Sequence, residues 1–81
     1  MDSFDSFEIW LDQNTDFTTR TKSNIKSRIR RADQILPFQQ TDVYVFHLSN
    51  EMKKKNLSVS VRSQIKKSIS LYLEFLNGVT K

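Results

Sequence analysis

The sequence predicts an all-α protein, a single compact domain of four helices that spans residues 1–81. Apolar residues recur at steps of three and four along four segments, which is the pattern of helices with one buried side. The 81 residues include only one Gly and one Pro, too few for the tight turns of a small β-barrel or sandwich. A chain of this length buries about 60–65% of its unfolded surface, so we expect one small core.

The first helix is predicted from about Ser3 to Asp12. Asp2 or Ser3 can cap its N-terminus, and residues 13–16 form a polar loop after it. Its apolar side is defined by three residues at helical spacing, with Trp10 beside them: Phe4, Phe7 and Leu11. We favour a core role for these side chains over a partner-binding patch.

The second helix is predicted from about Thr19 to Leu36, with Thr18 or Thr19 as its N-cap. Pro37 ends it, because proline lacks an N–H and disfavours helical geometry in the residue before it. At 100° per residue its apolar side is a stripe of roughly 60°: Ile25, Ile29, Ala32 and Leu36. Lys26 lies on one flank, and the opposite side is polar: Arg20, Ser23, Ser27, Arg30, Arg31 and Gln34.

The third helix is predicted from Asp42 to about Lys54, with Thr41 as its N-cap. It has two apolar sides, one with Val45, Leu48 and Met52 and the other with Val43 and Phe46. A helix of this kind in a small protein is expected to be wedged between neighbours. Three lysines at 53–55 suit its negative C-terminal end, and they are also candidates for a phosphate grip.

The fourth helix is predicted from about Val59 to Asn77, with Ser58 or Ser60 as its N-cap and Gly78 as the stop signal. Its apolar stripe consists of Val61, Ile65, Ile69, Tyr72 and Leu76. Arg62 and Lys66 flank the polar side, which carries Ser60, Ser63, Lys67, Ser70 and Glu74. The second and fourth helices therefore share one design, a narrow apolar stripe with serines and cations opposite.

Charge is divided unevenly along the chain. Residues 1–16 carry five acidic and no basic side chains, a charge of −5, whereas residues 17–81 carry thirteen basic and four acidic ones, a charge of +9. Organised cationic helix faces are typical of proteins that bind a phosphate backbone, and short hydroxyls let a helix approach a groove closely. The competing interpretation is that these are ordinary solvated helix faces.

No residue pattern indicates catalysis, a cofactor or a metal site. His47 is the only histidine, and neither Cys nor a carboxylate accompanies it at ligand spacing. Tyr44 and Tyr72 lack a base or an Arg cluster that would activate them. We therefore expect a protein that is not an enzyme.

The predicted location is the cytoplasm. The longest apolar runs fall far short of the roughly 18 residues that a membrane span requires. The acidic N-terminus has neither the basic nor the apolar part of a signal peptide. The chain also contains no Cys, which fits a reducing compartment.

Taken together, these segments resemble the N-terminal core-binding domain of tyrosine recombinases, the phage integrases. Residues 7–13, FEIWLDQ, resemble the opening helix of that family. Residues 18–36 resemble its second helix, which begins at a Thr, and residues 41–76 resemble its short third helix and long fourth helix, which ends on a Phe-Leu pattern. The resemblance covers nearly the whole chain.

The resemblance implies a SAM-like fold, an orthogonal four-helix bundle that forms one half of a clamp around double-stranded DNA during phage DNA integration and recombination. In that family the second and fourth helices face the major groove. The DNA-binding residues predicted here are Thr19, Arg20, Ser23, Lys26, Ser27, Arg30, Arg31, Ser60, Ser63, Lys66, Lys67 and Ser70. The acidic first helix is expected on the far side from DNA, or against a protein partner.

One departure from the family concerns catalysis. The recombinase catalytic domain supplies an Arg, a Lys, a His-x-x-Arg motif and a Tyr nucleophile, whereas His47 is followed here by Leu48, Ser49 and Asn50. The chain is thus a fragment of a recombinase or a free-standing relative. Two other hypotheses stay open: a small phage or plasmid regulator that binds a protein through the end with Phe4, Phe7 and Trp10, and a purely structural helical adaptor.

Overall fold

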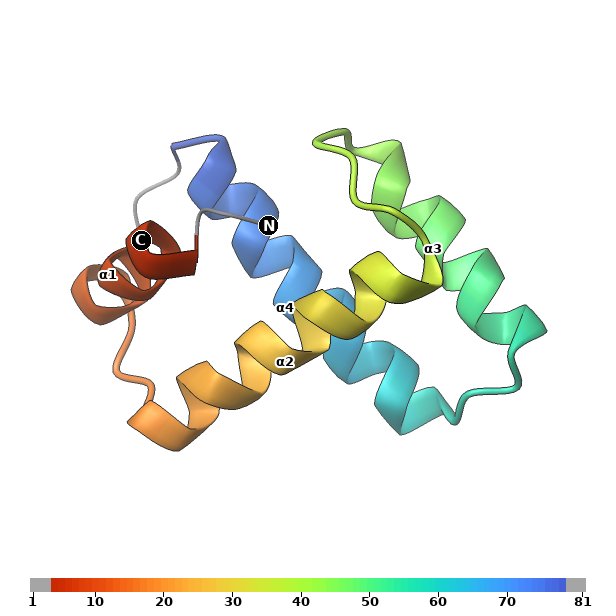
Figure 1. Cartoon of the computed structure of the whole chain (residues 1–81), viewed down its shortest axis with the longest axis horizontal. Coiled ribbons are helices and arrows are strands. Elements are labelled where there is room, and N and C mark those ends of the chain that lie inside the picture. Colours follow the sequence, from red (N-terminus) through yellow and green to blue (C-terminus); the bar gives the residue numbers. More distant parts are fainter. Residues whose placement is uncertain (1–3, 79–81) are drawn as a thin grey trace.

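The part of the chain that the structure describes forms four helices, and Figure 1 shows how they are arranged. The computed structural model describes residues 4–78, and no strand occurs in that range. The helices are α1 (Phe4–Asn14), α2 (Thr19–Ile35), α3 (Val43–Lys54) and α4 (Val59–Leu76). Helices α2 and α4 cross and form the most extensive helix–helix contact, with α1 on one side of the crossing and α3 on the other. The predicted all-α class and the four-helix order are confirmed.

Most helix ends follow the predicted signals. The Thr18 hydroxyl accepts a hydrogen bond from the Thr21 N–H at 3.2 Å, and the Ser58 hydroxyl accepts one from the Val61 N–H at 3.2 Å. Gly78 has a φ of 74°, the left-handed geometry that favours glycine after a helix. These three positions fix where α2 and α4 begin and where α4 ends.

Two predicted ends differ from the structure. Helix α1 continues to Asn14 rather than stopping at Asp12, because the Asn14 side chain donates to the Trp10 carbonyl at 2.9 Å and extends the last turn. Helix α3 begins at Val43, and its capping residue Asp42 makes no side-chain capping hydrogen bond. The predicted caps Asp2 and Ser3 lie outside the described residues.

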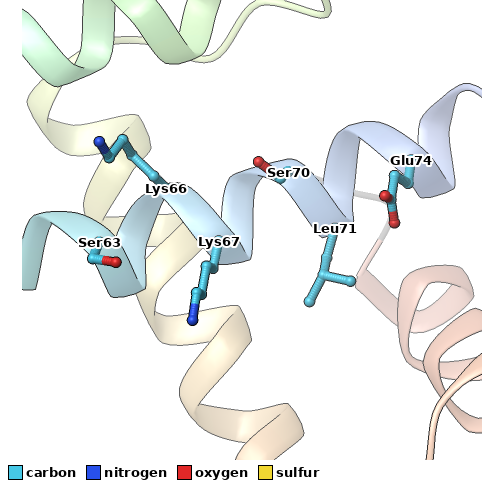
Figure 2. Close-up of a pocket in the computed structure, with 6 residues that line it drawn as sticks. All are labelled: Ser63, Lys66, Lys67, Ser70, Leu71 and Glu74. Atoms are coloured by element: carbon cyan, nitrogen blue, oxygen red, sulfur yellow. The ribbon is translucent and has the colours of Figure 1, made fainter.

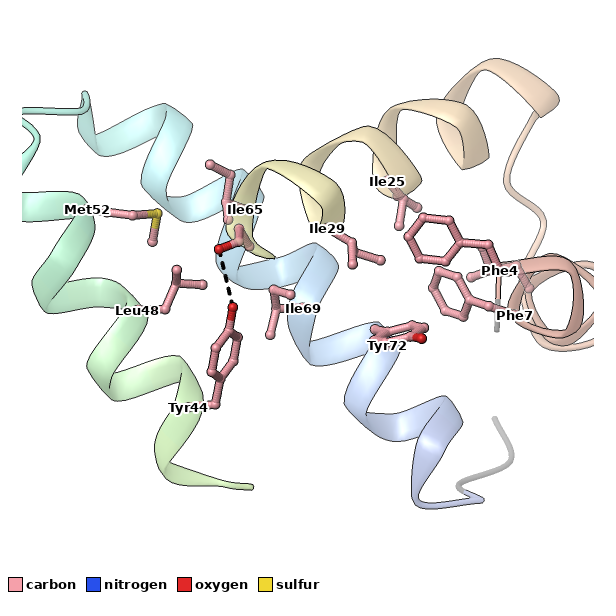
Figure 3. Packing of buried hydrophobic residues seen from close by; sticks show 12 residues of the cluster. Phe4, Phe7, Ile25, Ile29, Tyr44, Leu48, Met52, Ile65, Ile69 and Tyr72 are labelled. Atoms are coloured by element: carbon pink, nitrogen blue, oxygen red, sulfur yellow. Dashed lines mark hydrogen bonds between the residues drawn. The ribbon is translucent and has the colours of Figure 1, made fainter. Parts of the chain in front are cut away.

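All four helices contribute to one core (Figure 3). At the α1 end the core is aromatic, and the Tyr72 ring lies edge-on to Phe4 at 5.8 Å and to Phe7 at 5.1 Å. At the α3 end it is mainly aliphatic, with Leu48 and Met52 fully buried. Burial of Phe4, Phe7 and Tyr72 confirms their predicted core role.

The prediction that α3 is wedged between neighbours is wrong. Val43 and Phe46 are 56% and 67% exposed, and Tyr44 is buried on the inner side instead, in line with Leu48 and Met52. A phenol can be buried here because the end of α2 offers it acceptors. The Tyr44 hydroxyl donates to the Leu36 carbonyl at 2.6 Å and lies 3.3 Å from the Ala32 carbonyl.

The same surroundings keep the Tyr44 hydroxyl protonated. Burial, and secondarily the negative charge of Asp33, raises the pKa of Tyr44 from 10.0 to about 12. Because the neutral phenol is the form that donates to the α2 carbonyls, this side chain acts as a structural hydrogen-bond donor.

Among residues 4–78, none of the helices combines the length and the apolar character that crossing a bilayer requires.

Candidate nucleic-acid interface

One side of α2 is engaged by the acidic helix α1. Lys22 is only 9% exposed, and its ammonium group forms an ion pair with the Asp12 carboxylate. One turn further, the Lys26 ammonium lies 2.9 Å from the Glu8 carboxylate. The charges of the two lysines are therefore neutralised by α1, because acidic residues of α1 lie directly opposite them.

Arg30 continues this side of α2. Its guanidinium lies 4.8 Å from the centre of the Phe4 ring, a cation–π contact, although the side chain as a whole is exposed. Lys26 and Arg30 were both predicted to contact DNA. The structure shows that Lys26 is half-buried in its ion pair and that Arg30 rests against an aromatic ring of α1. Contact of either residue with DNA stays a prediction.

The other side of α2 borders a hollow of about 370 Å³ that it forms with α4. We call this hollow the α2–α4 groove. It is lined by Phe17, Thr21, Ile25, Arg28, Gln64, Lys67, Ser68 and Leu71. Arg28 from α2 and Lys67 from α4 therefore lie on the same concave surface, with apolar side chains between the polar ones.

A second hollow, of about 450 Å³, lies along α4 (Figure 2). Figure 2 shows α2 passing behind α4, with Lys66 and Lys67 pointing to opposite sides of α4. The residues that line this α4 hollow are Ser63, Lys66, Lys67, Ser70, Leu71 and Glu74. Lys67 and Leu71 line both hollows, so Lys67 stands at the boundary between them.

The twelve predicted DNA contacts are spread over more than one surface. Four of them line the α4 hollow, Ser63, Lys66, Lys67 and Ser70, and among the twelve only Lys67 also lines the α2–α4 groove. Lys26 and Lys66 are half-buried, and the other ten are exposed: Thr19, Arg20, Ser23, Ser27, Arg30, Arg31, Ser60, Ser63, Lys67 and Ser70. The sequence therefore predicted correctly that these ten side chains are exposed. It did not predict which of them lie together on one surface.

Seven of the eight groove residues were not predicted as binding residues: Phe17, Thr21, Ile25, Arg28, Gln64, Ser68 and Leu71. A signal for Arg28 was present, since it follows Ile25 by three residues and therefore lies on the same side of the helix. The predicted binding residues were those on the side of each helix opposite its apolar stripe. Where two helices cross, however, the residues that meet lie at the edges of the two stripes.

The aromatic end of α1 offers a partner little surface. Phe4 is 9% exposed and Phe7 is fully buried, whereas Trp10 is half-buried and stacks on Phe7 at a centroid distance of 6.1 Å. The large apolar side chain that is exposed on α1 is Ile9, at 57% exposure. A protein partner at this end stays a prediction, and it would have to use Ile9 and the open edge of Trp10.

In the described part of the chain, no group of three or more His, Asp or Glu side chains could hold a metal ion. His47 is exposed, as expected for a surface residue, and its ring lies edge-on to Phe46 at 5.9 Å.

No protein-family model, no curated protein and no solved structure matches this chain.

Proposed function

We propose that this chain is a DNA-binding module that holds duplex DNA against the α2–α4 groove and has no catalytic activity or cofactor of its own. One observation carries the proposal: Arg28 and Lys67, from two different helices, lie on one concave surface. Duplex DNA presents one negative charge per roughly 1.7 Å of helix axis. Two cations held on one rigid surface are suited to neighbouring phosphates of that array.

The two helices that form the groove carry further exposed cations and hydroxyls. Arg20 and Arg31 are exposed on α2, and Ser60 and Ser63 are exposed on α4. Their guanidinium and hydroxyl groups are the groups that proteins use to fix their position on a phosphate backbone. Residues 17–81 carry a net charge of +9, which favours association with any polyanion.

The arrangement of helices supports a more specific version of the proposal. A pair of crossing helices, flanked by one short helix on each side, agrees with the SAM-like core-binding domain that the sequence resembles. On that basis we place the chain in a phage or mobile-element recombination system, as a fragment or a free-standing relative of an integrase. It would contact DNA there without performing the strand chemistry.

The proposal is tested by fluorescence anisotropy with a labelled duplex across a salt series. Non-specific modules bind with Kd values of about 10⁻⁴–10⁻⁶ M, and their affinity falls steeply as salt rises. Arg28→Gln and Lys67→Gln should each weaken binding and lower the salt slope by about one, the value for one lost phosphate contact. Their matched control is Lys26→Gln, which removes one charge from the opposite side of α2.

Two results would contradict this proposal. One is an affinity that does not change with salt. The other is a loss in Lys26→Gln as large as that in Lys67→Gln, because it would show that the groove is not the contact surface. If the affinity does not change with salt, the second candidate, a small regulator that acts through protein contact, takes precedence. The exposed Val43 and Phe46 on α3 favour that candidate.

A further inference from the structure

The α2–α4 groove is lined by apolar side chains as well as by cations, and the phosphates of a duplex would contact only the cations. We propose that it binds a single unpaired nucleotide that projects from a DNA duplex, with the base against the Phe17 ring and the adjoining phosphates beside Arg28 and Lys67. This inference rests on the proposed DNA binding and names the feature of DNA that the groove prefers.

The apolar part of the groove suits a base. Phe17 is 40% exposed and lies directly before Thr18, the residue that caps α2. Ile25 and Leu71 line the same hollow. Within residues 4–78 the Phe17 ring forms no pair with another aromatic ring, unlike Phe7, which contacts Tyr72 at 5.1 Å. An exposed ring that the core does not use is available for stacking on a base.

The polar part of the groove suits the rest of a nucleotide. Arg28 and Lys67 line it from α2 and α4, so cations from both helices are present for the phosphates on either side of the base. Gln64 lines the hollow as well. Its amide offers both donors and an acceptor, which match the mixed donors and acceptors on the Watson–Crick edge of a base.

Size decides between a nucleotide and a larger occupant. The hollow measures about 370 Å³, near the lower limit of roughly 300 Å³ for sites that bind small molecules. A duplex is too thick to enter such a hollow and can only lie across it. One extruded nucleotide can enter while its neighbours stay paired above the groove, so the two modes of contact are compatible.

The test compares three DNA probes of the same sequence by fluorescence anisotropy at one salt concentration: a perfect duplex, a duplex with one bulged adenine, and a duplex with one bulged abasic residue. The abasic bulge keeps the flexibility and the extra phosphate but lacks the base. We expect the adenine bulge to bind roughly tenfold more tightly than the other two, the effect of about one base–aromatic stack.

Substitutions at Phe17 test whether its ring is the source of the preference for the adenine bulge. Phe17→Leu should lose the preference and keep the affinity for the perfect duplex, whereas Phe17→Tyr, which keeps the ring, should retain both. Phe46→Leu is the matched control, since Phe46 is an exposed aromatic residue on α3 outside the groove. Circular dichroism and the melting temperature show whether each variant is folded. If Phe17→Leu does not fold, Phe17→Tyr still tests the inference.

The outcomes separate this inference from the proposed function. Equal affinity for the adenine and abasic bulges overturns the inference, because DNA flexibility then explains any preference, and so does a preference that survives in Phe17→Leu. The inference is also overturned if neither bulge binds more tightly than the perfect duplex. The groove would then be a candidate site for a protein segment. The proposed function fails separately, if binding to the perfect duplex is unaffected by Arg28→Gln and Lys67→Gln.

Discussion

The two sides of α2 carry similar cations and use them differently. On the side of α1, Lys22 and Lys26 are paired with acids of that helix. On the side of α4, Arg28 lines a groove with another cation, Lys67. Lys26 and Arg28 are two residues apart and therefore about 200° apart around the helix, almost opposite one another. A count of basic residues along α2 thus overstates the charge that a polyanion can reach.

The contrast also explains the uneven charge of the sequence. The expectation that the acidic segment lies on the far side from DNA, or against a protein partner, stays a prediction. Two of its acids, Glu8 and Asp12, form ion pairs with lysines of α2. Their carboxylates neutralise one side of α2 within the molecule. The cationic character is thereby concentrated on the side that carries the groove.

A third contact of α2 involves no charge pair. At its C-terminal end, the neutral Tyr44 hydroxyl of α3 donates to the Leu36 carbonyl at 2.6 Å. Helix α1 is therefore held to α2 by ion pairs and a cation–π contact, and α3 is held to it by a buried phenol. The two attachments should respond differently to pH and to mutation.

The largest expected effect concerns the α3 attachment at alkaline pH. The pKa of Tyr44 is raised to about 12 in the folded protein against 10.0 for an ordinary tyrosine, so the unfolded chain loses this proton first. The associated stability is fully present below pH 10 and is lost between about pH 10 and 12. A shift of two units corresponds to about 2–3 kcal/mol.

Urea unfolding from pH 8 to pH 12 measures this loss, and Tyr44→Phe is the control. The Phe variant should be less stable at pH 8, because it leaves the Leu36 carbonyl without its donor, but its stability should decline less above pH 10. Parallel curves for the two proteins would show that Tyr44 does not supply the alkaline transition.

Much of the fold could be predicted because its signals are local. The stripes of α2 and α4 follow from the spacing of residues such as Ile25, Ile29, Ile65 and Ile69, all of which are buried. The inner side of α3 could not be assigned in this way. Tyr44 is buried because carbonyls at the end of α2 accept its hydroxyl, and that arrangement exists only once the chain has folded.

The candidate site was less predictable for the same reason. The exposure of Arg20 and Lys67 follows from their position opposite an apolar stripe. The pairing of Lys26 with Glu8 joins residues 18 positions apart, and no periodicity contains that information. Arg28 was missed because its place in the groove depends on where α4 crosses α2.

A smaller effect is expected from breaking the buried ion pair on the α1 side. Asp12→Asn keeps the shape of the side chain but leaves the Lys22 ammonium, whose residue is 9% exposed, without its anion. Asp12 itself is largely open to solvent, so water replaces part of the interaction, and we expect a loss of roughly 1–2 kcal/mol. Thermal or urea unfolding measures it.

The control for this substitution is Asp16→Asn, which removes an exposed acid from the loop after α1. It should change stability by less than about 0.5 kcal/mol, as is usual for surface substitutions. Equal effects of the two substitutions would mean that Lys22 gains nothing from its partner. The side of α2 that faces α1 would then be held by packing alone.

The smallest effect is expected from the half-buried pair on the α1 side, Lys26 and Glu8, and it is measured on DNA affinity. Glu8→Gln frees Lys26 from the carboxylate that lies 2.9 Å from its ammonium. Lys26 lies nearly opposite Arg28, across a helix about 10 Å wide, and the Debye length at physiological salt is about 8 Å. A phosphate at the groove should therefore hardly sense the change, and duplex affinity should rise by less than about twofold.

The double variant Glu8→Gln/Lys26→Gln identifies the source of any larger gain. If Glu8→Gln tightened binding severalfold and Lys26→Gln cancelled that gain, the freed lysine would be contacting DNA. The side of α2 that faces α1 would then be a masked part of the interface, and the two sides of α2 would differ only in whether α1 covers them. A gain that persisted without Lys26 would instead reflect the change in net charge, and the contrast between the two sides would stand.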